Sequence, residues 1–403
     1  GDSYQIDLKD KNWSAYHDMS KLTNSNYVFK TVLQDSHRHS AIDDLLELLN
    51  GYQPKFLELA IIASYRPIFE LDWSSLVLIN ADNEKLLSRL LLEPKKENEL
   101  ASKIRNFKTI SNKTSLKVKN QYEENPYPRW VNTSKASFTL TIPEFLQRMD
   151  LKANNTYFKE TKSPRVLVAG CGTGQHSILA STRFKNSTAL AIDLSLKSLG
   201  YAKMKTEELN INNIEYKNAD ILDLDNYKEK FDVIESSGVL HHMEDPFLGW
   251  KILTKCLKTG GLMAIGLYSE LARKHVVEIR REIKNLRFSD DFEGIKSFRK
   301  IIKNSNNLHH KKVQSMLDFY TTSTLRDLLF HVQEHRFTIP QIKKSLDELG
   351  LTFCGFESTR INKIFKEKYP EDEKLYDLNC WNEFEIQNPD TFIGMYQFWC
   401  QKL

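Results

Sequence analysis

The sequence lacks most of the features that mark membrane, secreted or disulfide-rich proteins. No apolar run approaches the roughly 18 residues that a membrane span requires, and the first residues, GDSYQIDLKDKNW, have neither the basic start nor the apolar stretch of a signal peptide. The chain begins at Gly1 rather than Met, so whether a segment precedes it is left open. The five cysteines are widely spaced and include no C-x-x-C pair. These absences predict a reduced, cytoplasmic protein with no membrane insertion.

Internal repeats, low-complexity tracts and a strong charge excess are also absent. Lys and Arg number 57 against 53 Asp and Glu, a net charge of +4, which excludes a protein whose whole surface binds a polyanion. Basic residues do exceed acidic ones within Arg273–Lys312, but the only aromatic residues there are Phe288, Phe292 and Phe298. Because runs of this kind are usually solvated and stacking residues are sparse, a nucleic-acid partner is not expected.

The length of 403 residues corresponds to roughly 2.7 domains of average size. Between Ala41 and Ile104, apolar residues recur at helical spacing, beginning with Ile42, Leu45, Leu46 and Leu49, and Gly51 and Pro94 stand where helices should stop. We expect an N-terminal helical domain over residues 1–120, a linker or lid over 121–163, a core over 164–270, a helical insertion over 271–345 and the last strands of the core over 346–403.

From Pro164 onward, short β-branched runs alternate with amphipathic segments, which is typical of a parallel α/β sheet. The expected strands are Arg165–Ala169, Ala189–Asp193, Ile214–Asn218, Asp232–Ser236 and Leu262–Leu267, followed after the insertion by Leu351–Glu357 and Thr391–Gln401. The Gly260-Gly261 pair is expected to form the turn into the fifth strand.

A glycine loop follows the first expected strand. Gly170 and Gly172 allow a tight turn and a close approach to a ligand. A dinucleotide fold would have glycine at the position of Gln175, and a phosphate-binding P-loop would continue with Gly-Lys-Ser/Thr, which is absent. The G-x-G-x-G spacing therefore suits a ligand that carries adenosine without phosphate, and S-adenosylmethionine meets that description.

Acidic residues stand at the ends of the next two strands. Asp193 is placed to accept hydrogen bonds from both ribose hydroxyls, and Asp220, beside Ile221, to accept from an adenine amino group. The segment from Ser236 to His242 leaves the fourth strand, where folds of this kind open their ligand crevice.

These segments resemble the class I S-adenosylmethionine-dependent methyltransferases. The resemblance covers about residues 164–270 and is carried by VLVAGCGTG, ALAID, NADILDLD, FDVIESSGVLHHMEDP and LKTGGLMAIGLYS. It implies an α/β, Rossmann-like core of seven strands whose last strand is antiparallel, here with an N-terminal helical domain and a helical insertion. The cofactor would be S-adenosyl-L-methionine, with S-adenosyl-L-homocysteine as product.

The segment QYEENPYPRW before the sheet allows two interpretations. It is similar to the Asn-Pro-Pro-Tyr box of amino-methylating enzymes, but that box normally follows the fourth strand. The segment is either a proline-fixed linker with Trp130 packed on the sheet or a lid over the cofactor. The expected cofactor-binding residues, lid included, are Gly170, Cys171, Gly172, Gly174, Gln175, Asp193, Leu194, Asp220, Ile221, Ser236, Ser237, Tyr122, Asn125, Pro128 and Arg129.

YEENPYPRW, RDLLFHVQEHRFTIPQI and GMYQFWCQK together resemble a subset of bacterial methyltransferases, and the chain is similar to rickettsial protein-lysine methyltransferases that modify outer-membrane protein. This resemblance implies methylation of lysine amines on a protein. A small-molecule methyltransferase is the alternative, and an inactive cofactor-binding assembly protein is a third. The methyl acceptor, the number of methyls transferred and the oligomeric state, with a homodimer among the alternatives, stay open.

The candidate catalytic residues near the methyl group are His241, His242, Tyr268 and Glu235. Either histidine could instead cap or pack its loop. His331, Glu334 and His335 are expected within one helical turn, which could bind a metal, face the substrate or simply pack. Because the order differs from H-E-x-x-H, no metal is expected.

Overall fold

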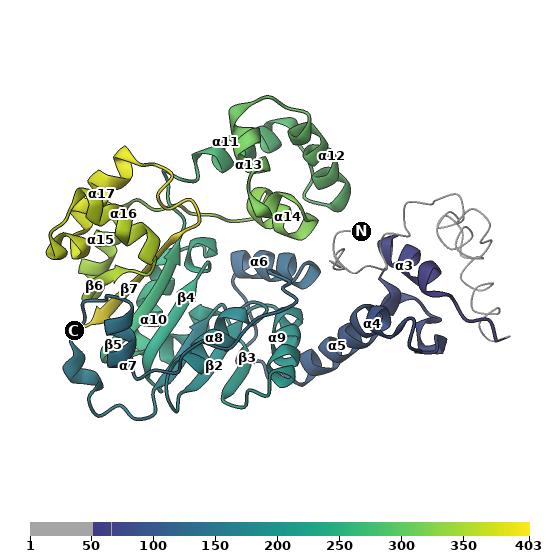
Figure 1. Cartoon of the computed structure of the whole chain (residues 1–403), viewed down its shortest axis with the longest axis horizontal. Helices are drawn as coiled ribbons and strands as arrows, with labels where there is room; N and C mark the ends of the chain where they lie inside the picture. Colours follow the sequence, from purple (N-terminus) through teal and green to yellow (C-terminus); the bar gives the residue numbers. More distant parts are fainter. Residues whose placement is uncertain (1–50, 66) are drawn as a thin grey trace. The chain divides into compact units, whose positions relative to one another are not determined.

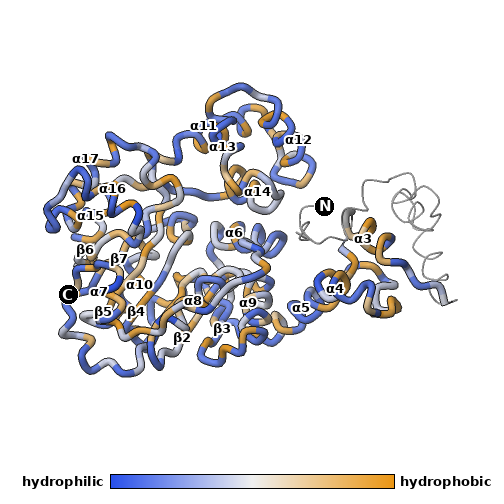
Figure 2. The backbone as a smooth tube through the Cα atoms, in the orientation of Figure 1, coloured by the Kyte–Doolittle hydropathy of each residue, from blue (hydrophilic) through white to orange (hydrophobic). Residues whose placement is uncertain are grey.

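The computed structural model describes residues 51–65 and 67–403, which form two compact units, one ending at Glu99 and the other spanning Leu100–Leu403. The first unit contains helices α3 (Phe56–Tyr65) and α4 (Glu84–Leu87), the π-helical turn η5 (Ser88–Leu92) and the start of α5 (Glu93–Lys103). In Figure 2, α3 is largely hydrophobic and α5 largely hydrophilic. The core of this unit includes Leu59, Trp73 and Leu87. The residues Ile42, Leu45, Leu46 and Leu49, for which a helix was predicted, lie outside the described residues.

The prediction that a helix stops at Pro94 is wrong. Helical turns continue from Glu84 to Lys103, and Pro94 is the second residue of α5. The preceding turn is π-helical, with the amide of Glu93 donating to the carbonyl of Ser88, five residues earlier. Proline has no backbone N–H to donate and its ring crowds the preceding turn of an α-helix. The wider π-helical turn before Pro94 changes the hydrogen-bond spacing there, and the helix continues through the proline.

The second unit is built on a seven-stranded sheet of order β3-β2-β1-β4-β5-β7-β6 (Figure 1). Strands β1 to β5 run parallel, and β7 is antiparallel to both β5 and β6. The predicted seven-stranded sheet with an antiparallel last strand is therefore confirmed. The strands are β1 (Arg165–Ala169), β2 (Thr188–Asp193), β3 (Ile214–Asn218), β4 (Phe231–Ser237), β5 (Leu257–Leu267), β6 (Leu351–Phe356) and β7 (Tyr396–Lys402).

Several strand ends differ from expectation, and β7 begins at Tyr396 instead of Thr391. Strand β5 begins at Leu257, so Gly260 and Gly261 lie within it instead of forming a turn before it. The Gly260 backbone has φ +78°, and a Cβ there would lie 2.1 Å from the ring of Tyr157, which explains the glycine without a turn. Strand β3 ends at Asn218 as expected, but Asp220 does not end it and instead caps the 3-10 helix η7 (Ile221–Asn226).

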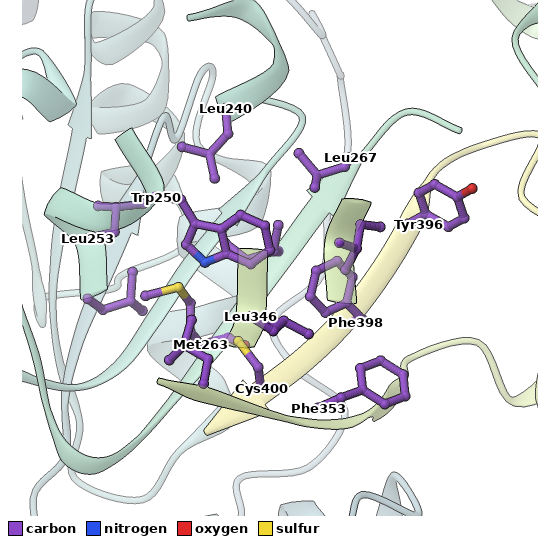
Figure 3. Close-up of a cluster of buried hydrophobic side chains, with 14 of the residues drawn as sticks. Leu240, Trp250, Leu253, Met263, Leu267, Leu346, Phe353, Tyr396, Phe398 and Cys400 are labelled. Atoms are coloured by element: carbon purple, nitrogen blue, oxygen red, sulfur yellow. The ribbon is translucent and has the colours of Figure 1, made fainter. Parts of the chain in front are cut away.

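Helices cover both faces of the sheet. Val166 and Val168 of β1 point to one face with Phe145, Ala180 and Leu199, whereas Leu167 and Ala169 point to the other face. The second face is packed with Trp250, Met263 and Phe398 (Figure 3). The first layer is α7 (Ile142–Arg148), α8 (Gln175–Arg183) and α9 (Leu196–Glu208), and the second is α10 (Pro246–Cys256), α15 (Ile339–Leu349), α16 (Thr359–Lys368) and α17 (Leu378–Gln387). In a sheet covered on both faces, a ligand is expected to bind outside the carboxyl ends of the parallel strands.

The segment between β5 and α15 is helical and has a core of its own, which includes Val276, Phe298 and Leu325. Its two ends are paired, because the amide of Phe337 donates to the carbonyl of Tyr268 and the amide of Glu270 donates to that of Phe337, both at 2.8 Å. The helices are α11 (Lys274–Leu286), α12 (Phe292–Lys303), α13 (Leu308–Gln314) and α14 (Thr322–Phe330).

The expectation that His331, Glu334 and His335 share a helical turn is wrong, because α14 ends at Phe330. The following residues form no helix, and the amide of His335 donates to the carbonyl of His241 at 2.7 Å. This pairing with the loop after β4 satisfies backbone groups that a longer helix would have satisfied internally. Of the residues described, no helix is both long and apolar enough to cross a membrane, and no cluster of three or more His, Cys, Asp or Glu could hold a metal ion.

Candidate functional site

The glycine loop joins β1 to α8 and turns through three left-handed positions. Gly170, Gly172 and Gly174 have φ of +78°, +51° and +90°. A Cβ at Gly170 would lie 2.3 Å from a methyl of Val239, and one at Gly174 would lie 2.5 Å from Cβ of Ala202. Glycine is therefore required here both by backbone conformation and by the close packing of the neighbouring loop and helix.

Asp193, at the end of β2, is tied to this loop. Its Oδ2 accepts a hydrogen bond from the amide of Gly172 at 2.8 Å, and its Oδ1 accepts one from the amide of Ser195 at 2.9 Å. Burial raises the pKa of Asp193 to about 6, against the opposing effect of these two bonds. Each oxygen keeps a second lone pair, so the carboxylate can accept two further hydrogen bonds from a ligand.

Asp220 provides a second carboxylate beside the glycine loop. The glycine loop, Asp193 and Asp220 are together called the cradle below. Its Oδ1 accepts from the amide of Leu222 at 3.0 Å. Burial raises the pKa of this carboxyl, and a hydrogen bond with the side chain of Ser115 from α6 (Lys113–Glu124) opposes the rise. Apolar surface from Leu194 and Ile221 lies beside it in the same cavity. Two carboxylates separated by apolar surface suit the ribose hydroxyls and planar base of an adenosine.

These residues line one cavity of about 290 Å³. Of the residues predicted from sequence, the cavity brings together Gly170, Cys171, Gly172, Gln175, Asp193, Leu194, Asp220, Ile221, Ser237, Tyr122, Pro128, His242 and Tyr268. It does not include Gly174, Asn125, Arg129, Ser236, His241 or Glu235.

Several of the residues outside the cavity have clear roles elsewhere. Glu235 is buried, accepts a hydrogen bond from Arg183 at 2.7 Å and pairs with His176 at 2.6 Å. Burial acts to raise the pKa of Glu235, but these two partners lower it to about 2. The guanidinium of Arg129 lies over the ring of Tyr201, 4.7 Å from its centroid. Asn125 is the C-cap of α6. Ser236 is fully buried in β4.

The segment after α6 lies against the glycine loop. The hydroxyl of Thr173 donates to the carbonyl of Pro128, and the indole nitrogen of Trp130 donates to the carbonyl of Thr173 at 3.2 Å. The hydroxyl of Ser195 donates to the carbonyl of Tyr122 at 3.2 Å. These contacts hold the end of α6 and the segment after it against the glycine loop, where Tyr122 and Pro128 line the cavity.

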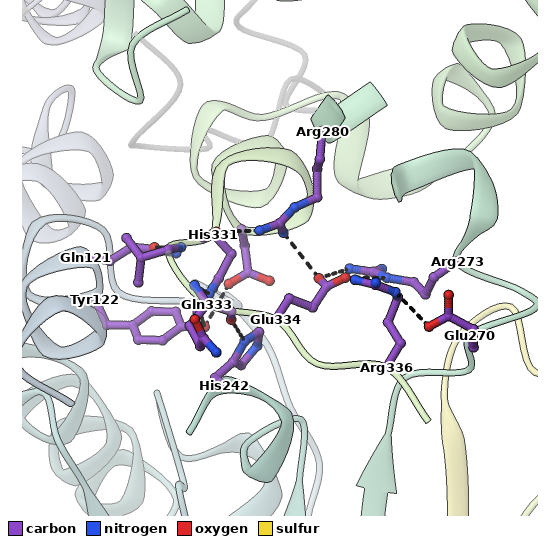
Figure 4. Close-up of polar contacts among 12 residues, drawn as sticks. Gln121, Tyr122, His242, Glu270, Arg273, Arg280, His331, Gln333, Glu334 and Arg336 are labelled. Atoms are coloured by element: carbon purple, nitrogen blue, oxygen red, sulfur yellow. Dashed lines mark hydrogen bonds and ion pairs between the residues drawn. The ribbon is translucent and has the colours of Figure 1, made fainter. Parts of the chain in front are cut away.

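His242 and, from the insertion, Asp327 also line the cavity. Figure 4 shows His242 beside Gln333 of the insertion. The Nδ1 of His242 lies 2.6 Å from the carbonyl oxygen of Gln333. Because a carbonyl can only accept, Nδ1 carries the proton and Nε2 keeps a lone pair. Burial lowers the pKa of His242 to about 4, so the ring is neutral at pH 7.

A hydrogen-bonded chain continues from His331. The amide of Gln333 donates to Nδ1 of His331 at 3.1 Å, which leaves the ring proton on Nε2. Nε2 lies 3.2 Å from the hydroxyl oxygen of Tyr122 and donates to it, and that hydroxyl donates to Oδ1 of Asp327 at 2.7 Å. Burial lowers the pKa of His331 and raises that of Asp327 to about 6, the latter against the Tyr122 hydrogen bond and Arg273.

Tyr268, the residue after β5, is fixed from both sides. The guanidinium of Arg273 lies 3.7 Å from its ring centroid, and the ring of His241 stacks on it at 4.0 Å. Tyr268 also lines the cavity. Burial raises the pKa of Tyr268, so the phenol is neutral.

A buried ion cluster holds this part of the insertion together. Arg273 donates to Glu334 at 2.6 Å and Arg280 donates to the same carboxylate at 3.3 Å, while Arg280 also donates to the carbonyl of His331 at 2.6 Å. The Glu334 side chain is 1% exposed. Burial opposes ionisation, but the two arginines hold the pKa of Glu334 below its usual value. The cluster fixes the segment that orients His242.

Sequence reasoning missed several cavity residues, above all Asp327. Its one sequence signal is an acidic residue set among Leu325, Leu328 and Leu329 on what proves to be a buried helix. Other lining residues that were missed are Ser115, Val118, Tyr127, Thr173, His176, Ser198, Ala219, Gly238, Val239, Met243 and Met395.

Comparison with known proteins places the site in a family context. The family described as "Methyltransferase domain" matches residues 160–321. An uncharacterized protein of Synechococcus sp. is 26% identical over 247 residues, covering 58% of this chain and 59% of its own length. An uncharacterized protein of Rickettsia prowazekii is 28% identical over 148 residues, covering 36% and 56%. The chain thus spans less than two thirds of the length of these curated relatives.

A plant protein and a solved structure are also similar to this chain. Phosphoethanolamine N-methyltransferase 1 of Arabidopsis thaliana is 25% identical over 165 residues, covering 41% of this chain and 31% of its own. The structure of PKMT2 from Rickettsia typhi is 20% identical, covers 68% of this chain and 53% of that chain, and has a TM-score of 0.48.

Proposed function

We propose that this chain, which carries a class I S-adenosylmethionine-dependent methyltransferase domain, transfers methyl groups to lysine amines of a protein. When bound, the cofactor supplies a methyl group activated on a sulfonium sulfur. In this proposal, residues 121–163 act as a lid on the cofactor, and the insertion over 271–345 helps to form the acceptor site.

The residues of the cradle fit the cofactor. Asp193 offers two free lone pairs for the ribose hydroxyls, and Asp220 offers an acceptor for the adenine amino group. Leu194 and Ile221 supply apolar surface for the base. The glycine loop brings backbone close to the ligand without a side chain in between.

The observation that carries the proposal is the continuity of the cradle with a polar acceptor end in one cavity. Asp327 from the insertion and His242 from the loop after β4 line the same cavity as Asp193 and Asp220. A lysine amine with a pKa near 10.4 needs roughly 4.6 kcal/mol to lose its proton at pH 7. Holding the nitrogen in line with the methyl group is then the main contribution that the cavity would make.

A small metabolite amine is the second candidate. It is supported by the similarity to a phosphoethanolamine N-methyltransferase, whose acceptor is also an amine. The retained glycine loop and both cradle carboxylates argue against the third hypothesis, an inactive cofactor-binding protein.

The two acceptor classes separate in one experiment. The protein is incubated with methyl-labelled S-adenosylmethionine and, in parallel, with a protein extract freed of small molecules and with a metabolite extract freed of protein. The proposal expects label on lysine residues after peptide mass spectrometry, and none with Asp193→Ala. Label confined to the metabolite fraction would replace it with the second candidate.

A further inference from the structure

We propose that Asp327 is the residue that recognises the methyl acceptor, binding it as a cationic aliphatic amine through Oδ2. This inference deepens the proposed function and rests on it. Three carboxylates line the cavity: Asp193 and Asp220 belong to the cofactor cradle, and Asp327 is the third. Because an adenosine uses only the first two, the third carboxylate is available for a cationic group.

The surroundings of Asp327 leave one of its oxygens for a ligand. The side chain is buried, with the residue 6% exposed, and Oδ1 is occupied by the hydroxyl of Tyr122 at 2.7 Å. Asp327 lines the cavity, and within the described part of the chain no hydrogen bond reaches Oδ2, which is not among the fully buried polar atoms that lack a partner. Among the described residues Oδ2 therefore has no hydrogen-bond partner, and it can accept a hydrogen bond from a ligand in the cavity.

The hydrogen-bonded chain fixes Asp327 as an acceptor. The amide of Gln333 donates to His331, His331 donates to Tyr122, and Tyr122 therefore has its single proton free for Asp327. Each hydrogen bond in this series is donated toward Asp327, an arrangement that suits the ionised form of the carboxylate. With a pKa raised by burial to about 6, the group is still mainly ionised at pH 7.5.

The neighbouring charges do not neutralise this carboxylate directly. Arg273 and Arg280 are both engaged by Glu334, and the Arg273 guanidinium also covers the ring of Tyr268. The positive charge of Arg273 acts on Asp327 only at a distance, without a hydrogen bond between them among the described residues. Another acidic group nearby, Asp318, is hydrogen-bonded to Tyr127.

An ammonium group has the chemistry that matches this arrangement. It can donate one N–H to Oδ2 of Asp327 and others to neutral acceptors, which His242 Nε2 and the hydroxyl oxygen of Tyr268 provide at the same cavity. A hydroxyl acceptor has one proton and no charge to offer, and a carboxylate acceptor would be repelled. The site therefore selects aliphatic amines over both.

Transfer then balances as follows. The bound ammonium releases one proton to solvent, the nitrogen lone pair forms the N–C bond as the C–S bond breaks, and the positive charge passes from sulfur to nitrogen. Asp327 thus faces a cation both before deprotonation and after transfer. Its negative charge favours the developing charge on nitrogen.

The test uses the full chain saturated with S-adenosylhomocysteine and two probes of similar shape, n-butylammonium and n-butanol, with binding measured by saturation-transfer NMR at pH 7.5. The wild type is expected to bind n-butylammonium at least tenfold more tightly than n-butanol. Asp327→Asn, which keeps an oxygen for Tyr122, should abolish that preference and leave n-butanol binding unchanged. Asp318→Asn is the matched control and should change neither affinity more than twofold.

Equal binding of the two probes to the wild type, or retention of the preference by Asp327→Asn, would overturn the inference. Asp327→Ser provides a second variant should the asparagine protein fail to fold, with the same expectation. Because the probes are small and no methyl is transferred, the result is independent of the proposed protein substrate. Absence of lysine labelling with the amine preference intact would reject the proposed function and leave the role of Asp327 standing.

Discussion

His242 and His331 stack face to face, with ring centroids 3.6 Å apart and an interplanar angle of 19°. One ring comes from the loop after β4 and the other from the residue that follows α14. Burial lowers the pKa of both rings, so neither is charged at neutral pH and the contact is free of repulsion. The position of a cavity-lining imidazole thus depends on the insertion as well as on the sheet.

Cofactor affinity should depend on pH through Asp193. Its pKa of about 6 means that only about one molecule in ten has this carboxylate ionised at pH 5. Because the ribose hydroxyls donate to the ionised form, we expect the dissociation constant of S-adenosylmethionine to be about tenfold higher at pH 5 than at pH 7.5. Titration calorimetry at the two pH values measures it. Asp193→Asn should bind weakly with no such dependence, and a wild type insensitive to pH would contradict the assignment.

Stability should respond to Asp327 in the opposite direction from a salt-bridged carboxyl. A folded-state pKa of about 6, above the usual 3.8, means that the folded state holds its proton more tightly, so stability is lost as pH rises from about 4 to about 6. Asp327→Asn removes this cost. We expect it to raise the free energy of unfolding by about 1.4 kcal/mol more at pH 7.5 than at pH 5, measured by urea denaturation. An equal effect at both pH values would show that the carboxyl is not perturbed.

Substitution in the glycine loop should damage both folding and cofactor binding. Gly170→Ala places a Cβ 2.3 Å from Val239 at φ +78°, so strain and overlap add. Gly350→Ala is a matched control, since it has φ +65° but no atom within 4 Å of the added Cβ. The control should lose about 1–2 kcal/mol, and Gly170→Ala about 1–3 kcal/mol more, together with cofactor binding. Similar losses in the two variants, by thermal unfolding, would mean that Val239 moves aside freely.

The buried ion cluster should be far more sensitive than surface pairs. Glu334→Gln leaves Arg273 and Arg280 buried without a carboxylate, which we expect to cost about 3–5 kcal/mol. Glu278→Gln removes the partner of Arg281 in a pair whose side chains are 41% and 63% exposed, and should cost less than about 1 kcal/mol. Chemical denaturation of both variants measures the difference. Equal values would show that water reaches the cluster.

The sheet could be predicted closely because its signals are local. Strands β1 and β3 have the predicted bounds, since each is a short apolar or β-branched run bounded by turn residues. The glycine loop and Asp193 were found for the same reason: their spacing along the chain is their spacing in the fold. Gly260 was misplaced because its role is to make room for Tyr157, a residue more than a hundred positions earlier.

The part of the cavity around Asp327 could not be predicted in this way. Asp327 is paired with Tyr122, 205 residues earlier, and no pattern within either segment records that contact. The segment from His331 to Phe337 has helical spacing, yet its backbone bonds to His241 and Tyr268 instead. Where long-range pairing competes with local propensity, the pairing prevails and the sequence pattern misleads.

The two hydrogen bonds that join Phe337 to the stretch Tyr268–Glu270 close the base of the insertion like a clasp. The insertion also packs on a core of its own, so its helices hold together apart from the sheet. Doubling such a closed loop costs only about 0.6 kcal/mol in chain entropy. A chimaera that exchanges the insertion can therefore be joined at these two hydrogen bonds, with the contacts of Asp327 to Tyr122 and of Gln333 to His242 kept in the new insert.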